Sequence, residues 1–271
     1  MRKQRSPLSA IFPLRTKDER VKGTVYLVGA GPGAADLLTL RAVRLLAEAD
    51  IVFHDALVSA EILSLAARAE KIAVGKRCGR HSTAQRFINK RLADAAARHR
   101  VVVRLKGGDP MLFGRAHEEI AFLRKQRIRT EVVPGITAAL AASAELQVSL
   151  TQRGVSRSVL FATPRAAEGE PPSSWARAAA AADTAVLYMA SGDAARVRVE
   201  LIGAGLRADT PVVVAEDVSL DCKTQYGVLS NLSQLVARCT GGPVLLLIGE
   251  VLAAISTKAV DISVDSRLYT A

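Results

Sequence analysis

Residues 104–115 combine the side chains and the backbone freedom that a ligand-binding loop needs. They read Arg-Leu-Lys-Gly-Gly-Asp-Pro-Met-Leu-Phe-Gly-Arg and follow the β-branched run 101–103. The two glycines after Lys106 let backbone N–H groups approach a ligand closely. Asp109 adds a carboxylate, and Pro110 stiffens the chain that leaves it. The segment therefore predicts a ligand loop at the end of a buried strand.

A second glycine loop, residues 29–34, reads Gly-Ala-Gly-Pro-Gly-Ala. It satisfies the loose fingerprint of dinucleotide-binding proteins, and Asp50 or Asp55 lies about 20 residues further on, where a ribose-binding acid is expected. However, Pro32 lies within the turn, and the helical pattern begins only at Thr39. This spacing moves the helix N-terminus away from the loop, which argues against an NAD-dependent oxidoreductase.

Short β-branched runs alternate with Ala- and Leu-rich helical patterns along most of the chain. Strands are predicted at 24–28, 51–54, 71–74, 101–105, 130–133, 158–161, 185–189, 212–215 and 244–248. Helices are predicted at 40–49, 59–67, 83–98, 115–126, 136–146, 174–182, 193–203 and 231–238. This alternation is typical of mainly parallel sheets that helices cover on both faces.

A Pro-Gly pair at 134–135 interrupts the alternation. The sequence therefore predicts two α/β domains with mainly parallel sheets, residues 22–134 and 135–252, with the active-site cleft between them because ligands favour such clefts. Residues 1–21 are expected to be a basic, disordered extension, and residues 253–271 a tail.

Composition limits the classes of protein that fit. With 49% hydrophobic and 23% charged residues in 271, the chain is expected to fold. It lacks both an apolar run of about 18–20 residues for a membrane helix and the apolar core of a secretory signal. Its three isolated cysteines indicate neither a disulfide framework nor a zinc site, so we expect a cytoplasmic protein without a metal. The net charge of +11 fits a solvated basic surface, an acidic small molecule or nucleic acid.

A series of short motifs follows one order along the chain. The motifs occupy residues 25–33, 36–40, 55–59, 75–77, 79–82, 104–115, 132–138, 150–154 and 188–189. In this order the chain closely resembles the uroporphyrinogen-III C-methyltransferases of the tetrapyrrole methylase family, over about residues 22–252. The resemblance implies a homodimer that methylates uroporphyrinogen III to precorrin-2 by way of precorrin-1, for sirohaem or cobalamin biosynthesis. It also implies S-adenosyl-L-methionine as the methyl donor and S-adenosyl-L-homocysteine as its product.

The resemblance also implies roles for particular residues. Cofactor contacts are expected from Pro32, Gly107, Gly108, Asp109, Leu112, Thr137, Ala138, Met189 and Val218. Asp55 is expected to accept a proton and Lys76 to donate one. Contacts to the substrate, an anionic tetrapyrrole, are expected from Arg77, Arg80, Phe113, Arg115 and Tyr188. Arginine suits this role because its guanidinium can bind a carboxylate through two hydrogen bonds.

Some positions depart from the family pattern. Ala56 replaces an arginine, Gln152 replaces a histidine, and residues 163–165 read Thr-Pro-Arg in place of Thr-Gly-His. Val218 replaces a smaller glycine or alanine at a cofactor contact. These departures leave open an impaired paralogue that binds S-adenosylmethionine without turnover. Only about 20 residues precede the resemblance, so the chain is expected to be the methyltransferase alone, without the dehydrogenase and ferrochelatase region of fused sirohaem synthases.

Two other enzyme classes remain as alternatives. Later precorrin and cobalt-precorrin methyltransferases share the fold and the cofactor, although residues 76–77 and 79–82 favour the uroporphyrinogen enzyme. A ribosomal RNA methyltransferase family also shares the fold, and the chain is basic. Aromatic residues make up only 4% of the chain, so platforms for base stacking are scarce. We therefore expect neither a nucleic acid nor a membrane as a partner.

Overall fold

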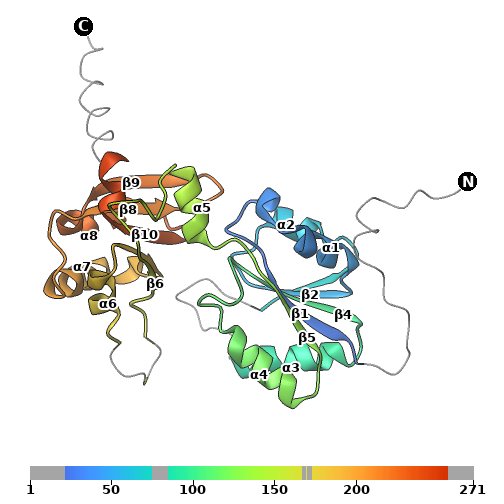
Figure 1. Cartoon of the computed structure of the whole chain (residues 1–271). Coiled ribbons are helices and arrows are strands. Elements are labelled where there is room, and N and C mark those ends of the chain that lie inside the picture. Colours follow the sequence, from blue (N-terminus) through green and yellow to red (C-terminus); the bar gives the residue numbers. More distant parts are fainter. Residues whose placement is uncertain (1–21, 75–84, 167–168, 170–172, 256–271) are drawn as a thin grey trace, which may run out of the picture.

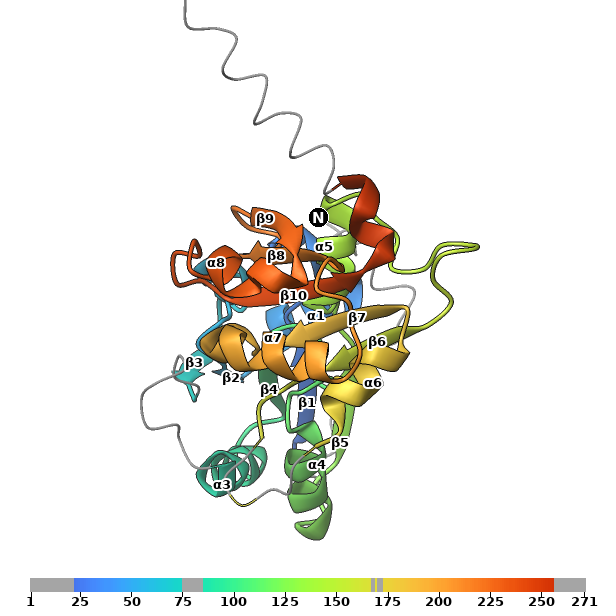
Figure 2. The same cartoon turned by 90° about the vertical axis from the view of Figure 1, so that its left-hand side faces the viewer.

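The computed structural model describes residues 22–74, 85–166, 169 and 173–255. It contains two five-stranded sheets, the first built from residues before 134 and the second from residues after 158. They stand side by side in Figure 1, and Figure 2 views the second sheet in front of the first. The predicted extension at 1–21 and most of the predicted tail lie outside the described residues.

The first sheet is entirely parallel, with the strand order β3-β2-β4-β1-β5. Its strands are β1 (Thr24–Gly29), β2 (Ile51–His54), β3 (Glu70–Ala73), β4 (Val101–Lys106) and β5 (Thr130–Val133). The helices between them are α1 (Leu40–Glu48), α2 (Ala60–Ser64), α3 (Gln85–Ala96) and α4 (Ala116–Lys125). Parallel strands need such crossover helices, so the predicted β/α alternation is confirmed for this sheet.

Helices cover both faces of the first sheet. Leu45 and Leu46 of α1 pack with Val103 in the core on one face. On the other face, Leu92 of α3 and Leu123 of α4 pack in a separate core. Figure 1 shows α1 and α2 on one side of the strands and α3 and α4 on the other. Covering by apolar helix faces explains why β1 and β2 are nearly continuous hydrophobic runs, whereas the edge strand β3 is mostly exposed.

The second sheet is mixed, with the order β6-β7-β10-β8-β9. Its strands are β6 (Val159–Ala162), β7 (Thr184–Tyr188), β8 (Pro211–Glu216), β9 (Lys223–Val228) and β10 (Val244–Gly249). Only β6 and β7 pair in parallel, while β10 is antiparallel to β7 and β8, and β9 is antiparallel to β8. The prediction of mainly parallel sheets therefore holds for the first sheet but not for this one. The sequence did not predict β9, because this half-exposed edge strand lacks an apolar run.

Helices also cover both faces of the second sheet. The core on one face contains residues from α6 (Trp175–Ala181), α7 (Ala194–Gly203) and α8 (Leu232–Val236). The other face packs against α5 (Ala138–Glu145), the first helix after the chain leaves β5. Among the described residues, none of the helices is both long and apolar enough to span a membrane.

Candidate functional site

Three loops meet at the carboxyl edge of the first sheet. Gly31, after β1, and Gly108, after β4, form a two-bond bridge with N···O distances of 3.2 and 2.7 Å. Asp109 then accepts hydrogen bonds from the backbone of Gly135, after β5, at 2.9 Å and from that of Met111 at 2.7 Å. Loops after neighbouring parallel strands are a common place for ligands in such sheets.

The loops approach so closely that side chains would not fit between them. A Cβ atom on Gly135 would lie 2.3 Å from the carbonyl oxygen of Gly108 and 2.8 Å from the Cα of Gly29. A Cβ on Gly29 would lie 2.6 Å from the Cα of Gly135. Gly108 also has φ of +66°, which glycine adopts without strain. These glycines therefore let the three loops pack against one another.

The predicted cofactor residues at this edge differ in their hydrogen bonds to the protein. Both carboxylate oxygens of Asp109 already accept backbone N–H groups, so this side chain orders the loops. Gly107 is half-buried, and a Cβ there would make an ordinary 3.6 Å contact with Leu57. Pro32 and Leu112 are also half-buried, one in each glycine loop.

Helix α1 does not begin on the first glycine loop. Thr39 caps it by accepting a hydrogen bond from the backbone N–H of Ala42 at 3.2 Å, and a 3-10 turn (Ala35–Leu37) lies between the loop and the helix. The displacement predicted from the sequence is therefore confirmed. The helix N-terminus is thus not placed as in a dinucleotide-binding turn.

Asp55 follows β2 at the same edge and contacts a buried arginine. Arg104 Nη2 donates to Asp55 Oδ1 at 2.5 Å, and the two side chains are 3% and 29% exposed. Arg104 Nε also donates to Glu119 of α4 at 3.1 Å, and Lys106 Nζ donates to the same carboxylate at 3.2 and 3.3 Å. The Glu119 side chain is completely buried. A connected group of four charges therefore has Asp55 as its most exposed member.

The sequence reasoning did not identify this group. Arg104 and Lys106 are two residues apart on β4, so they point to the same face of the sheet, the face that α4 covers. Two cations on one face of a buried strand were a signal that an acidic partner must lie opposite. Burial, followed by the positive charge of Arg104, lowers the pKa of the Lys106 ammonium.

Tyr188, the last residue of β7, contacts both the start of α5 and, through Phe113, the first half of the chain. Its hydroxyl lies 2.6 Å from Thr137 Oγ1 and accepts a hydrogen bond from the backbone N–H of Ala139 at 3.2 Å. The ring of Phe113 lies 5.1 Å from the Tyr188 ring, centroid to centroid. Burial raises the pKa of Tyr188. Thr137, Phe113 and Tyr188, three residues predicted for the site, are therefore brought together.

Three residues near this contact have left-handed backbones. Phe113, Arg115 and Met189 have φ of 51°, 55° and 55°, which is costly for side chains larger than glycine. The Met189 side chain is 45% exposed and follows Tyr188 directly. Arg115 is exposed and contacts Glu118 through both Nε, at 2.7 Å, and Nη2, at 2.9 Å. Strained apolar side chains that remain exposed beside strand ends are suited to covering a ligand.

A second contact joins the first glycine loop to the turn after β8. The backbone N–H of Ala34 donates to Ser219 Oγ at 3.0 Å. The neighbouring Val218 is only 5% exposed and packs in the core between α5 and the second sheet. Ala138, the first residue of α5, is half-buried at the edge of the same core. The predicted contacts of Val218 and Ala138 with the cofactor stay predictions.

Lys76, Arg77 and Arg80 lie outside the described residues. Among the departures from the family pattern, Ala56 is half-buried directly after Asp55, and Gln152 is exposed in a turn closed by its bridge to Ser156.

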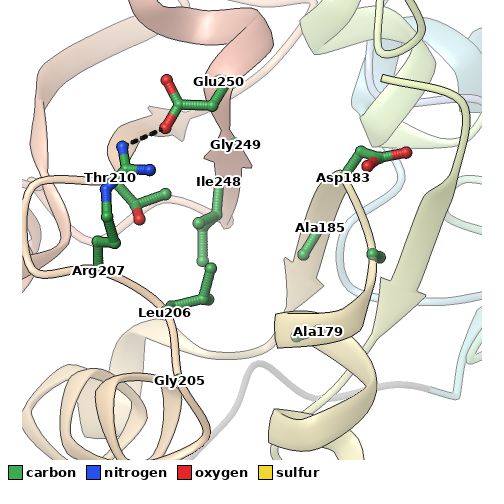
Figure 3. A pocket seen from close by; sticks show the side chains of 11 residues that line it. Ala179, Asp183, Ala185, Gly205, Leu206, Arg207, Thr210, Ile248, Gly249 and Glu250 are labelled. Atoms are coloured by element: carbon green, nitrogen blue, oxygen red, sulfur yellow. Dashed lines mark hydrogen bonds and ion pairs between the residues drawn. The ribbon is translucent and has the colours of Figure 1, made fainter. Parts of the chain in front are cut away.

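A cavity of about 220 Å³ lies elsewhere, beside the second sheet (Figure 3). It is lined by residues of α6, the α7–β8 connection and the end of β10, and the ion pair between Arg207 and Glu250, 2.8 Å long, stands at its wall. Asp183, which also lines it, precedes β7, whereas Tyr188 ends that strand. The cavity is therefore at the opposite end of β7 from the contact between the two halves.

Curated proteins similar to this chain include several siroheme synthases. A siroheme synthase from Psychrobacter sp. (strain PRwf-1) is 42% identical over 249 residues, which cover 90% of this chain and 51% of that protein. The chain spans about half the length of the curated relatives it matches.

Solved structures match over most of their length. The uroporphyrin-III C-methyltransferase of Thermus thermophilus, complexed with S-adenosyl homocysteine, is 37% identical with a TM-score of 0.75, covering 86% of this chain and 100% of that one. A cobalt precorrin-4 methyltransferase is 28% identical with a TM-score of 0.74, covering 84% of this chain and 95% of that one.

The family model of Tetrapyrrole (Corrin/Porphyrin) Methylases matches residues 24–235, which include the first sheet and all strands of the second sheet except β10. The strand-end loops, the charged group at Asp55 and the contact at Tyr188 all lie within this match. The chain belongs to the tetrapyrrole (corrin/porphyrin) methylase family.

Proposed function

We propose that this chain transfers methyl groups from S-adenosylmethionine to ring carbons of uroporphyrinogen III, forming precorrin-2 by way of precorrin-1. The likeness to the Thermus uroporphyrin-III C-methyltransferase carries the proposal, because it extends over the whole of that chain. The names of the siroheme synthases that it matches agree with this chemistry. S-adenosylhomocysteine is the second product.

The carboxyl edge of the first sheet fits the methyl donor. Glycines pack the three loops together, while the exposed Met189 and Phe113 remain available to a ligand. When bound, S-adenosylmethionine supplies a methyl group that its positively charged sulfur activates. The residues proposed to hold it are Pro32, Gly107, Gly108, Asp109, Leu112, Thr137, Ala138, Met189 and Val218. Of these, Asp109 and Thr137 also bind neighbouring protein groups, so part of their role is to shape the loops.

The protein's main tasks are positioning and removal of a proton. A ring carbon that gains a methyl group leaves the macrocycle with an extra positive charge, which the loss of one proton neutralises. Asp55 is proposed to accept that proton, because its carboxylate is partly exposed at the edge of the sheet. Lys76 is proposed as the proton donor, and a proton that it gives to one position of the macrocycle has to be offset by the loss of another proton. Neither a metal nor a covalent intermediate is part of the proposal.

The acceptor carries carboxylates, so basic side chains are proposed to bind it. Arg77, Arg80 and Arg115 are the proposed contacts, with Phe113 and Tyr188 beside the macrocycle. Arg115 already pairs with Glu118, and this pairing raises the pKa of its guanidinium. It would therefore have to exchange or share this partner to bind substrate. The Phe113 and Tyr188 rings offer apolar surface rather than charge.

A later precorrin methyltransferase is the second candidate, because the cobalt precorrin-4 methyltransferase has nearly the same TM-score as the Thermus enzyme. Lower sequence identity, 28% against 37%, makes it the weaker one. The chain is further proposed to act in the cytoplasm as a homodimer of two-domain subunits, with domains at 22–134 and 135–252. Light scattering on the purified protein would measure its oligomeric state.

An anaerobic assay tests the reaction. The protein is incubated with S-adenosylmethionine and uroporphyrinogen III, and precorrin-2, or sirohydrochlorin after oxidation, is followed by absorbance and mass. Formation of a product with two added methyl groups is expected. Binding of S-adenosylhomocysteine in calorimetry without any methylated product would contradict this acceptor. Cobalt-precorrin substrates would then distinguish the second candidate from an impaired paralogue.

A further inference from the structure

The guanidinium of Arg104 is held by three acceptors at once. Its Nε donates to Glu119 at 3.1 Å, its Nη1 to the carbonyl of Leu105 at 3.1 Å, and its Nη2 to Asp55 at 2.5 Å. A guanidinium is planar and its N–H directions are fixed, so the first two contacts set the direction of the third. Asp55 thus receives a donor whose orientation other residues determine.

Glu119 is the buried end of this arrangement. Its side chain is inaccessible to solvent and accepts hydrogen bonds from Arg104, Lys106 and Gln85 Nε2, the last at 3.0 Å. It lies in the first turn of α4, where the helix dipole favours a negative charge. Glu119 is buried away from the sheet edge, so any influence on catalysis must pass through the residues that it binds. Among its described partners, Arg104 is the one that contacts Asp55.

Lys106 balances the charge in this group. Two carboxylates face two cations, and the depressed pKa of Lys106 reflects how strongly burial and Arg104 oppose a further positive charge there. Among the described contacts, Lys106 pairs with Glu119 and not with Asp55. Removing Lys106 together with the charge of Glu119 would therefore leave the total charge unchanged while it still frees Arg104.

We propose that Glu119 is a positioning residue for the methyl transfer, which fixes Asp55 through Arg104 in the orientation needed to accept the proton. The inference rests on the proposed function, in which the Asp55 carboxylate accepts the proton. It extends that proposal to the buried residues Arg104 and Glu119, neither of which contacts a reactant. The same group also ties β4 to α4, on either side of the loop at 107–115.

The test compares Glu119→Gln with Glu216→Gln, a matched substitution. Glu216 is a glutamate of the second sheet, is 1% exposed, and binds the backbone at residues 240–242, not a cation. For Glu119→Gln, kcat is expected to fall roughly 10- to 100-fold, as when a catalytic group is displaced by about 1 Å. The KM values and the Kd for S-adenosylhomocysteine are expected to stay within about threefold. Glu216→Gln is expected to keep kcat within about threefold, since its partners lie outside the charged group.

Two additions keep the test informative if Glu119→Gln folds poorly. The double variant Glu119→Gln/Lys106→Met removes one anion and one cation, so it avoids an unbalanced buried charge. Its kcat is expected to fall like that of the single variant. The second addition is the side-chain carboxyl ¹³C resonance of Asp55, assigned by its loss in Asp55→Asn. It is expected to move in both Glu119 variants and not in Glu216→Gln, without any substrate present.

Each outcome bears on the inference. An unchanged kcat and an unmoved Asp55 resonance in folded Glu119 variants would overturn it, even if the wild-type protein forms precorrin-2. A loss of S-adenosylhomocysteine affinity as large as the loss of kcat would also overturn it, because Glu119 would then only brace the ligand loop. If the wild-type protein forms no methylated product, the proposed function fails and the catalytic part of the inference fails with it. The resonance would then still show whether Glu119 orients Asp55.

Discussion

The two sheets each bury a glutamate, and the two carboxylates are satisfied in opposite ways. Glu119, beside the first sheet, accepts its hydrogen bonds from side chains, two of them cationic. Glu216, at the end of β8, accepts from the backbone N–H groups of Thr240, Gly241 and Gly242 and from the Thr240 hydroxyl. One carboxylate is thus joined to a side chain that reaches the sheet edge, and the other closes a turn.

Two buried carboxylates can therefore have different roles, one in stability and one in positioning another side chain. Burial by itself would raise the pKa of Glu216, but the backbone N–H groups outweigh it and hold the pKa below its usual value. That carboxylate stabilises the connection to β10, and its described hydrogen-bond partners all lie at residues 240–242. At Glu119, the donor Arg104 also donates to Asp55, so a change at Glu119 can reach Asp55 through one side chain. The comparison therefore predicts that the first sheet governs chemistry and the second governs stability.

The largest effect is expected from Asp55→Asn. Asparagine keeps the shape and an acceptor for Arg104 but is a far weaker base, so kcat should fall about 100- to 10,000-fold. Affinity for S-adenosylhomocysteine, measured by calorimetry, should stay nearly constant. If the variant retains more than a tenth of the wild-type kcat, Asp55 is not the proton acceptor and the proposed role of this sheet edge in the reaction is wrong.

Next in size is Gly135→Ala. The new Cβ would press on Gly108 and Gly29, and overpacking of this kind costs about 1–3 kcal/mol. If the strain falls on the ligand loops, affinity for S-adenosylhomocysteine drops roughly 5- to 150-fold. Gly203→Ala is the control, because a Cβ there meets no atom within 4 Å. Equal affinities in the two variants would contradict the tight packing of the loops.

Glu216→Gln sharpens the comparison through its pH dependence. The variant should lose about 1–3 kcal/mol of unfolding free energy at pH 7, since backbone N–H groups lose a charged acceptor. The folded-state pKa is depressed, so this stabilisation is present above the unfolded value of about 4.3 and disappears as the pH falls through the folded pKa. Denaturant unfolding at several pH values should therefore show that the difference in unfolding free energy between the wild type and the variant shrinks below about pH 4. A difference that stays constant with pH would contradict the role of the charge.

The smallest effect is expected from Tyr188→Phe, at the contact between the halves. Loss of the hydroxyl removes a partner from Thr137 and from the first turn of α5, at a cost of about 0.5–2 kcal/mol. The ring contact with Phe113 remains, so KM for the tetrapyrrole should change less than about threefold. A large rise in KM with unchanged stability would instead mean that the hydroxyl binds substrate directly.

Much of the fold follows from local patterns. The strands of the first sheet and the Thr39 cap were predicted because apolar runs, β-branched residues and capping residues act over a few neighbours. By contrast, β9 was missed and the second sheet is mixed. The direction in which a strand pairs depends on how distant connections fold back, and a half-exposed edge strand leaves little periodic signal.

The candidate site divides in the same way. The sequence alone determined the glycine loops, the family resemblance and the presence of Asp55, because these depend on residue types in a fixed order. Only the tertiary structure decided that Glu119 meets Arg104 and Lys106, and that Tyr188 meets Thr137. Glu119 lies in α4 and its two cationic partners lie in β4, while Tyr188 ends β7 and Thr137 precedes α5. Their contacts depend on crossover handedness and helix packing, which no local pattern of residues contains.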